Sequence, residues 1–250
     1  MSVARASIIL KQVSDLPNAL AQTEDFEFAA LNEAKNYRLA LLRDFEAHLR
    51  GNVLEVGAGI GQITSELCRM PQIKKTFSIE PDEAFCAQFR ARLPQLDLLH
   101  GTVGDLHSET VWNAILSINV LEHIEKDGDE LASYYRLLRP AQGALCLFVP
   151  ARPEIYAPID KDFGHFRRYT RPELRSKLLG AGFRLQSIRY YNFVGYFAWW
   201  LNFCLLKQRS FDVASVRLFD RAIFPLVHGF ESRICAPPIG QSLMAAAVAR

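Results

Sequence analysis

The residues with the clearest chemical potential directly follow an apolar run. Glu55, Gly57, Gly59 and Gly61 form an E-x-G-x-G-x-G pattern, and a helical pattern starts at once after it. Glycines let a flat ligand lie close to the backbone, and the first amides of a helix can face a carboxylate. A dinucleotide loop would need a third glycine where Gln62 stands. The pattern predicts a ligand site at a strand-to-helix turn and disfavours a nicotinamide cofactor.

Two acidic residues follow the next two strand-like runs. Glu80 ends the run KTFSIE, and Asp105 follows LDLLHGTV with Leu106 beside it. A carboxylate has two acceptor oxygens, so Glu80 can accept both hydroxyls of a ribose. Asp105 can accept from an exocyclic amine, and Leu106 can flank the ring. Helix capping is the alternative for both acids. Together with the glycines, they predict a site for a nucleoside-containing ligand.

The elements that must position these residues alternate along the chain. Apolar runs at 52–57, 75–80, 96–103, 112–119 and 143–150 are separated by helical patterns at 60–69, 82–93 and 127–138. Strands of this kind predict an α/β fold with a parallel sheet covered on both faces. Ligands then bind at the carboxyl ends of the strands.

These motifs resemble the class I S-adenosylmethionine-dependent methyltransferases. The resemblance implies a Rossmann-like, seven-stranded, mostly parallel sheet whose last strand is antiparallel, and S-adenosylmethionine as the cofactor. It assigns the methionine and loop contacts to the glycine motif, the ribose to Glu80, and the adenine to Asp105 and Leu106. Tyr37, on the preceding helix, is expected to close over the cofactor, or else to lie on a partly exposed helix surface. Asn119 is counted with the cofactor-binding residues.

The loop after the fourth strand has the sequence SINVLEH. This sequence indicates whether a metal ion binds there and which class of substrate is expected. It is similar to the E-V-L-E-H loop of the ubiquinone-pathway O-methyltransferases, in which two glutamates and a histidine can bind a divalent metal. Asn119 replaces the first glutamate here, and Glu122 with His123 are too few ligands, so we predict no metal. The loop also lacks the motifs that hold a flipped base, which disfavours nucleic acid as substrate.

Two histidines are the candidate general bases for an alcohol or phenol acceptor. Histidine has an unperturbed pKa close to neutrality, which suits it to proton transfer. His123 follows the fourth strand and His165 lies in the loop DKDFGHFRRYT after the fifth. A structural role in its loop is the alternative for each of them.

The same loop and the helix after it are rich in cations. One interpretation is a solvated surface, and the other is a clamp on an anionic acceptor, because arginine forks suit carboxylate and phosphate. The residues concerned are Arg167, Arg168, Arg171, Arg175 and Lys177.

An uncharged, aromatic-rich stretch covers residues 190–206, and an amphipathic helical pattern follows at 212–228. We interpret the two as a helical hairpin before the closing strand. A substrate lid, a homodimer surface and an interfacial membrane helix all stay open for it. The predicted organisation is an N-terminal helical cap (1–50), a cofactor-binding core (51–192 and 238–250) and an apolar helical insert (193–237).

Composition sets the remaining bounds. The 250 residues carry a formal net charge of +2, so bulk charge does not favour nucleic acid. Five cysteines without a C-x-x-C pair predict free thiols in a reducing compartment. We expect a cytoplasmic protein, with peripheral membrane contact left open.

The expected activity is methyl transfer to an oxygen or nitrogen of a partly hydrophobic small molecule, anionic or lipid-like. A catalytically silent cofactor-binding partner protein and a nicotinamide-dependent oxidoreductase are the alternatives.

Overall fold

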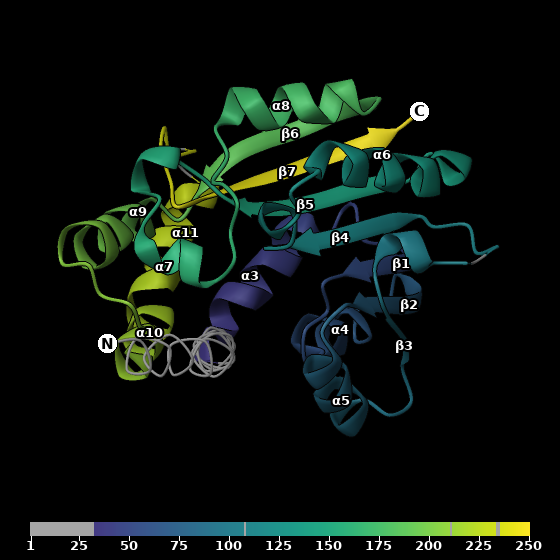
Figure 1. Cartoon of the computed structure of the whole chain (residues 1–250), viewed down its shortest axis with the longest axis horizontal. Coiled ribbons are helices and arrows are strands. Elements are labelled where there is room, and N and C mark those ends of the chain that lie inside the picture. Colours follow the sequence, from purple (N-terminus) through teal and green to yellow (C-terminus); the bar gives the residue numbers. More distant parts are fainter. Residues whose placement is uncertain (1–32, 108, 211, 234–235) are drawn as a thin grey trace, which may run out of the picture.

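A computed structural model describes residues 33–107, 109–210, 212–233 and 236–250. The fold is a seven-stranded sheet in the order β3-β2-β1-β4-β5-β7-β6 (Figure 1). Only β7 is antiparallel to its neighbours, β5 and β6, and the other pairings are parallel. The strands are β1 (Gly51–Val56), β2 (Ile73–Glu80), β3 (Asp97–His100), β4 (Ala114–Ile118), β5 (Ala144–Pro150), β6 (Phe183–Tyr191) and β7 (Ser242–Ala249).

Helices connect the strands and cover the sheet. They are α3 (Lys35–Phe45), α4 (Gln62–Leu67), α5 (Glu83–Arg92), α6 (Asp127–Leu138), α7 (Pro158–Asp162), α8 (Arg171–Gly180), α9 (Phe193–Trp199), α10 (Val213–Leu218) and α11 (Phe224–Arg233). Two π-helical segments continue α9 and α10, namely η5 (Trp200–Leu205) and η6 (Phe219–Ile223). Single turns lie at η1 (Val103–Asp105), η2 (Leu121–His123), η3 (Arg139–Ala141) and η4 (Pro153–Ile155).

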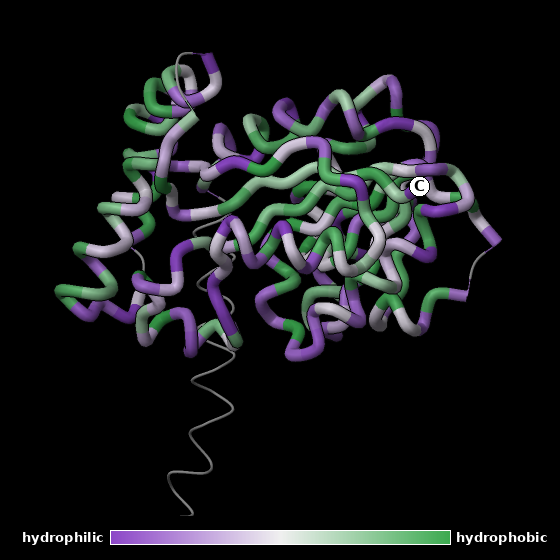
Figure 2. Tube along the Cα trace, turned by 90° about the horizontal axis from the view of Figure 1, so that it is seen from above, coloured by the Kyte–Doolittle hydropathy of each residue, from purple (hydrophilic) through white to green (hydrophobic). Residues whose placement is uncertain are grey.

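Alternate residues of the central strands enter two cores, one on each face of the sheet. On one face, Leu54 and Leu145 pack with residues of α6 and α8. On the other, Val53 and Cys146 pack with residues of α3, α4 and α11. The central strands are therefore predominantly hydrophobic (Figure 2), as the sequence predicts for a sheet covered on both faces.

Local sequence explains several element boundaries. Thr170 is the N-cap of α8, and its side chain accepts a hydrogen bond from the Glu173 amide, as a capping box requires. The third strand is shorter than its apolar run predicts. It stops at His100, because Asp105 instead accepts hydrogen bonds from the Thr102 amide and hydroxyl in turn η1.

Two buried carboxylates anchor the segment between β6 and β7. Asp220 in η6 accepts from the amides of Asn36 and Tyr37, so it caps the first turn of α3. Glu231 in α11 accepts from the amides of Asn192 and Phe193. The segment is thereby tied to the sheet and to α3.

Some sequence predictions fall wholly or partly on residues outside those described. The predicted N-terminal helical cap (1–50) overlaps them, and α3 is the helix described within it. Cys235 also lies outside the described residues, whereas Cys68, Cys86, Cys146 and Cys204 are free thiols.

Candidate active site

The loop between β1 and α4 requires glycine at specific positions. Gly57 has φ +73°, and a Cβ atom there would lie 2.3 Å from Cγ2 of Val120. Gly61 has φ +82°, and its Cβ would lie 2.6 Å from Cδ1 of Leu93. Any other residue would strain the backbone and push the walls apart. The glycines thus hold the turn close to the end of β4.

Glu55 lies buried under this loop with an unusual protonation state. Its Oε2 accepts a hydrogen bond from the Thr64 hydroxyl at 2.5 Å. Burial raises the pKa of Glu55 to about 8, so the carboxyl is mostly protonated at neutral pH. A cationic ligand group beside it would favour the ionised form.

Glu80 joins the end of β2 to the glycine loop. Its Oε2 accepts from the Gly59 amide at 2.7 Å, and its Oε1 accepts from the Asp82 amide at 3.0 Å. Each carboxylate oxygen has a second lone pair and can accept a ligand hydroxyl as well. The Asp82 side chain caps α5 through the Phe85 amide.

A cavity of about 300 Å³ lies over the carboxyl ends of β1, β2 and β4. The predicted residues that line it are Tyr37, Glu55, Gly57, Glu80, Asn119 and His123. Gly59 and Gly61 shape the loop instead. Asp105 and Leu106 are not among the described residues that line it, and Asp105 Oδ2 accepts hydrogen bonds from Thr102 in its own turn. Their predicted adenine contact stays a prediction.

A second cavity of about 570 Å³ adjoins the first, and Tyr37, Asn119 and Phe163 line both. Its remaining walls include Glu122, His165 and residues of α9, η5, α10 and η6. The Tyr37 ring also packs edge-on against Phe148 and Tyr191, and burial raises its pKa above the usual value. Two ligands held in the two cavities would meet at these shared residues.

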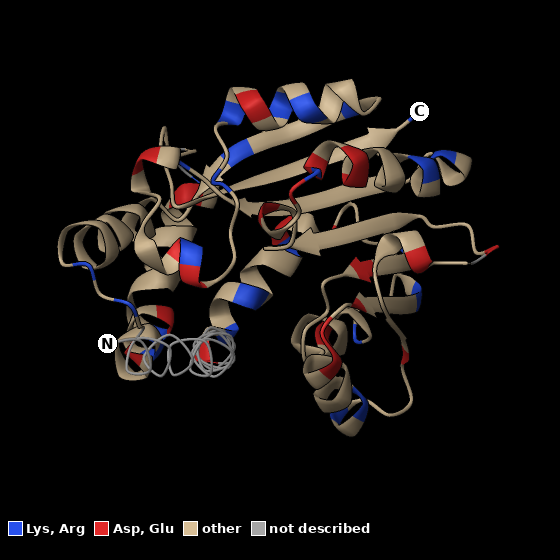
Figure 3. Cartoon of the chain, viewed as in Figure 1, with Lys and Arg blue, Asp and Glu red and all other residues tan. Residues whose placement is uncertain are grey.

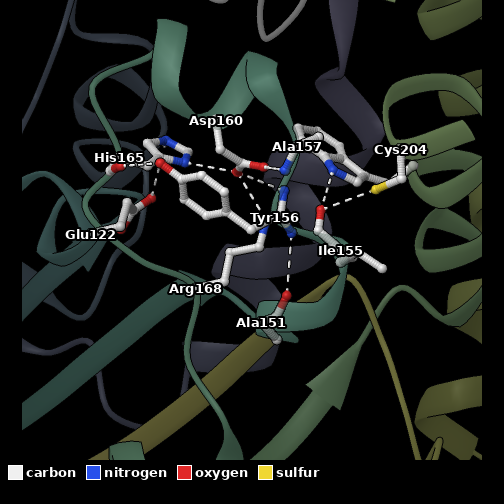
Figure 4. A network of polar contacts seen from close by, with 10 residues as sticks. Glu122, Ala151, Ile155, Tyr156, Ala157, Asp160, His165, Arg168 and Cys204 are labelled. Carbon is white, nitrogen blue, oxygen red and sulfur yellow. Dashed lines mark hydrogen bonds and ion pairs between the residues drawn. The ribbon is translucent and has the colours of Figure 1, made fainter. Parts of the chain in front are cut away.

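A buried polar network lies at the wall of the second cavity (Figure 4). Asp160 Oδ1 lies 3.0 Å from His165 Nδ1 and 2.9 Å from Arg168 Nε. Burial alone would raise the pKa of Asp160, but the hydrogen bond from His165 and the Arg168 guanidinium lower it below its ordinary value. The ionised carboxylate can only accept, so His165 carries its proton on Nδ1.

The other nitrogen of His165, Nε2, could accept a proton from a ligand. His165 is 8% exposed, and its Nε2 has no hydrogen-bond partner within the described part of the chain. The nearest carboxylate atom, Glu122 Oε1, is 4.0 Å away. With Nδ1 protonated, the buried Nε2 carries a lone pair, and His165 is one of the residues that line the second cavity.

His123 stands beside His165 but differs in environment. The two ring centroids are 4.6 Å apart. His123 lines the first cavity and is an exposed residue, whereas His165 is buried; desolvation by the atoms around His123, together with the neighbouring His165, lowers the pKa of His123 to about 4. It is therefore neutral at physiological pH.

Comparisons with known proteins show that the chain is similar to methyltransferases. A family profile for methyltransferase domains matches residues 53–141. A Mycolicibacterium smegmatis protein, described as a probable S-adenosylmethionine-dependent methyltransferase, is 27% identical over 180 residues, which are 69% of this chain and 68% of that protein. The chain carries a class I S-adenosylmethionine-dependent methyltransferase domain.

Solved methyltransferase structures share the fold. One, from Mesorhizobium loti, has a TM-score of 0.57 at 13% identity over 84% of this chain and 97% of its own. A TehB-like methyltransferase from Corynebacterium glutamicum has a TM-score of 0.55 at 18% identity, covering 92% and 99%. The predicted family, fold and cofactor are confirmed.

The first cavity fits S-adenosylmethionine on the observations above. Glycine is required where the loop meets Val120, so the backbone is bare next to the cavity. Glu55 can receive a cationic group, and Glu80 has lone pairs for ribose hydroxyls. We expect these residues of the methyltransferase domain to hold the cofactor.

The methyltransferase domain also contains a group of metal-ligand atoms that the sequence did not predict. Glu122, His123 and His165 each offer one ligand atom, and these atoms lie within 4.8 Å of one another. Two imidazoles and a carboxylate suit ions such as Zn²⁺ better than Mg²⁺. The sequence argument considered only Glu122 and His123, because His165 is far away along the chain.

The arginines of the loop are committed to contacts inside the domain. Arg168 is 3% exposed, and its guanidinium lies 4.3 Å from the Trp199 ring centroid as well as contacting Asp160. Arg167 and Lys177 both pair with Asp127, at 2.9 Å each. Asp160 was not singled out from the sequence, although its spacing to His165 and Arg168 in D-x-x-x-x-H-x-x-R could have indicated it.

Proposed function

We propose that this methyltransferase domain transfers the methyl group of S-adenosylmethionine to an oxygen or nitrogen of a partly hydrophobic small molecule. The observation that carries the proposal is the Asp160–His165 pair: His165 lines a cavity that adjoins the first one, and its buried Nε2 has no hydrogen-bond partner among the described residues. When bound, S-adenosylmethionine supplies a methyl group already activated by its sulfonium.

The second cavity supports an acceptor of medium size and mixed polarity. Aromatic and aliphatic walls, such as Phe148, Trp199 and Phe203, alternate with amides and hydroxyls, such as Asn202 and Gln241. Pockets of this composition bind small molecules with a few directional polar groups. In this proposal residues 193–237 wall the acceptor side, and residues 51–192 with 238–250 form the cofactor-binding core.

His165 acts as the general base in the proposed reaction. The acceptor O–H or N–H loses its proton to Nε2 as the acceptor atom forms its bond to the methyl carbon and the carbon–sulfur bond breaks. Asp160 keeps the Nδ1 proton in place and stabilises the resulting imidazolium, and Arg168 holds Asp160. Tyr37, Asn119 and Phe163 position the two ligands against each other, which supplies roughly 7–11 kcal/mol in favourable cases.

A screen with labelled S-adenosylmethionine tests the proposal. Purified protein is incubated with phenols, hydroxy acids, amines and amphiphilic alcohols, and labelled products are identified by mass spectrometry. We expect transfer to an oxygen or nitrogen, lost in His165→Ala and retained in His107→Ala, a variant of an exposed surface histidine. Full transfer by His165→Ala would contradict the assigned base, and transfer to a carbon or to nucleic acid would contradict the acceptor class.

A further inference from the structure

The helix formed by α9 and η5 is apolar on two faces. Residues 193–206 contain no charged side chain. One face packs Trp199 and Phe203 against Ile155, Ile159 and Phe163. This contact covers only one side of the helix.

The opposite face is exposed. Its large side chains recur every three or four residues, as one stripe of a helix does. They are Phe193 (36% exposed), Phe197 (46%), Trp200 (46%), Leu201 (46%), Leu205 (57%) and Leu206 (57%). A helix that is apolar all round is normally covered by protein or lipid.

A second group of exposed apolar side chains follows on α10, η6 and α11. Leu218, Leu226 and Phe230 are 63%, 77% and 56% exposed. Leu218 and Ile223 also line the second cavity, so exposed apolar residues rim its mouth. Ten of the fourteen exposed large hydrophobic side chains in the described residues lie between 193 and 230, which makes this one concentrated surface.

Among the solvent-exposed charged side chains of residues 193–233, basic ones outnumber acidic ones. Residues 193–233 contain five arginines and lysines against three acidic residues, and two of those acids, Asp220 and Glu231, are buried. Arg209 and Arg217 pair with Asp162 and Glu33 outside this segment, so its excess of positive charge comes from Lys207, Arg221 and Arg233. Figure 3 shows α9 free of charge and cations in the loop that follows it. Lys207 stands directly after the apolar stripe and is exposed.

We infer that this surface, defined by the exposed residues of α9, η5 and α10 to α11, docks on an anionic lipid membrane. Apart from the indole N–H of Trp200, the side chains of the apolar stripe carry no charge and no hydrogen-bonding group, so the stripe lacks the polar contacts that would fix the position of a protein partner. Aromatic rings with flanking cations match the headgroup region of a bilayer. None of the helices in the described residues has the length and apolar content needed to cross a membrane, so the contact is interfacial.

The position of the cavity mouth extends this inference to the acceptor, and this step rests on the proposed function. A lipid-like acceptor could keep its apolar part at the rim formed by Leu218 and Ile223 while its polar end reaches His165. Docking would then present the cavity to molecules dissolved in the membrane. The acceptor class narrows to amphiphiles.

Tryptophan fluorescence with vesicles tests the docking directly. Of the three tryptophans, Trp112 and Trp199 are buried, so Trp200 reports on the surface. We expect a blue shift and quenching by brominated lipid with phosphatidylcholine–phosphatidylglycerol vesicles, and little change with phosphatidylcholine alone. The full-length Trp200→Phe variant should lose the signal and still sediment with vesicles.

Matched variants assign the contact to the stripe. Replacing Leu201 and Leu205 together by Gln should weaken vesicle binding at least about ten-fold, because two exposed apolar side chains no longer enter lipid. Leu179→Gln is the control, since Leu179 is equally exposed (48%) on the distant helix α8. Lys207→Gln should weaken binding to anionic vesicles by about five-fold, the usual effect of one cation near such a surface.

Three outcomes would overturn the inference: no binding to anionic vesicles, equal loss in the Leu179 control, or a lipid-free dimer that Leu201→Gln dissociates. The last would assign the surface to a second copy of the chain. Vesicle binding does not require turnover, so docking without methyl transfer would contradict only the proposed function.

Discussion

The two cavities are built in different ways. The first cavity, which we propose holds the cofactor (the cofactor cavity), lies at the ends of the adjacent strands β2, β1 and β4: Glu80 ends β2, and the glycine loop and Asn119 follow β1 and β4. The second cavity, which we propose holds the acceptor (the acceptor cavity), combines segments that are distant in sequence, from Tyr37 to Ser242. The first depends on backbone geometry that the sheet imposes, and the second on long-range packing. Changes in the first should therefore alter cofactor affinity, and changes in the second should alter turnover and acceptor choice.

The largest expected effect is in the acceptor cavity. His165→Ala should lower the turnover number by about 10²–10⁴-fold, the usual contribution of a general base, and change the Michaelis constant less. Steady-state kinetics measures both values, and calorimetry should show unchanged cofactor affinity. A rise in the Michaelis constant alone would assign His165 to acceptor binding.

The next effect is in the cofactor cavity. Glu80→Ala should weaken S-adenosylmethionine binding by about 1.5–3 kcal/mol, the range for hydrogen bonds to charged groups. Calorimetric titration measures it, with exposed Glu83→Ala on α5 as the control. Because Glu80 also holds the Gly59 amide, thermal unfolding must show that the variant is folded. Unchanged affinity in a folded variant would remove Glu80 from the site.

Cofactor binding should also depend on pH through Glu55. Its pKa is raised to about 8 in the free protein, and a cationic group of the cofactor would lower it. Binding then releases a proton, so affinity should rise by up to about tenfold per pH unit below 8 and level off above it. Calorimetry in buffers of different ionisation enthalpy measures the proton release. Glu55→Gln should abolish it, and an unchanged release in that variant would assign the proton to another group.

The smallest expected effect is that of metal removal. We propose that the reaction needs no metal and that His165 serves as a base, so methyl transfer should survive dialysis against excess chelator. Activity before and after chelation is the measurement, with elemental analysis of the dialysed protein. Loss of activity and its recovery with Zn²⁺ or Mn²⁺ would instead make Glu122, His123 and His165 a ligand set.

The sequence by itself determined the family, the sheet and the strand ends that carry the predicted cofactor residues. The apolar runs correspond to five strands of the sheet, and Glu80 ends β2 as predicted. Such features can be predicted from sequence because the apolar runs of strands, the strand-to-helix turns and the glycine requirement at Gly57 depend on local properties of the backbone. Asp105 was predicted to contact adenine, but it does not line the first cavity, and its carboxylate accepts a hydrogen bond from the Thr102 amide. Sequence alone did not reveal this local hydrogen bond.

Only the tertiary structure decided the acceptor half. The contact of His165 with His123, and the approach of both to Glu122, depend on how the loops after β4 and β5 fold over the sheet edge. From the sequence, the cations of the loop after β5 were interpreted as a solvated surface or as an anion clamp. In the structure, Arg168 is buried against Asp160 and Trp199. Sequence spacing carries no information about the contacts of His165 with His123 and Glu122 or of Arg168 with Trp199, because the packing of separate segments sets them. The apolar helix at 193–206 was visible as composition, and only the structure showed which of its faces is covered and which is exposed.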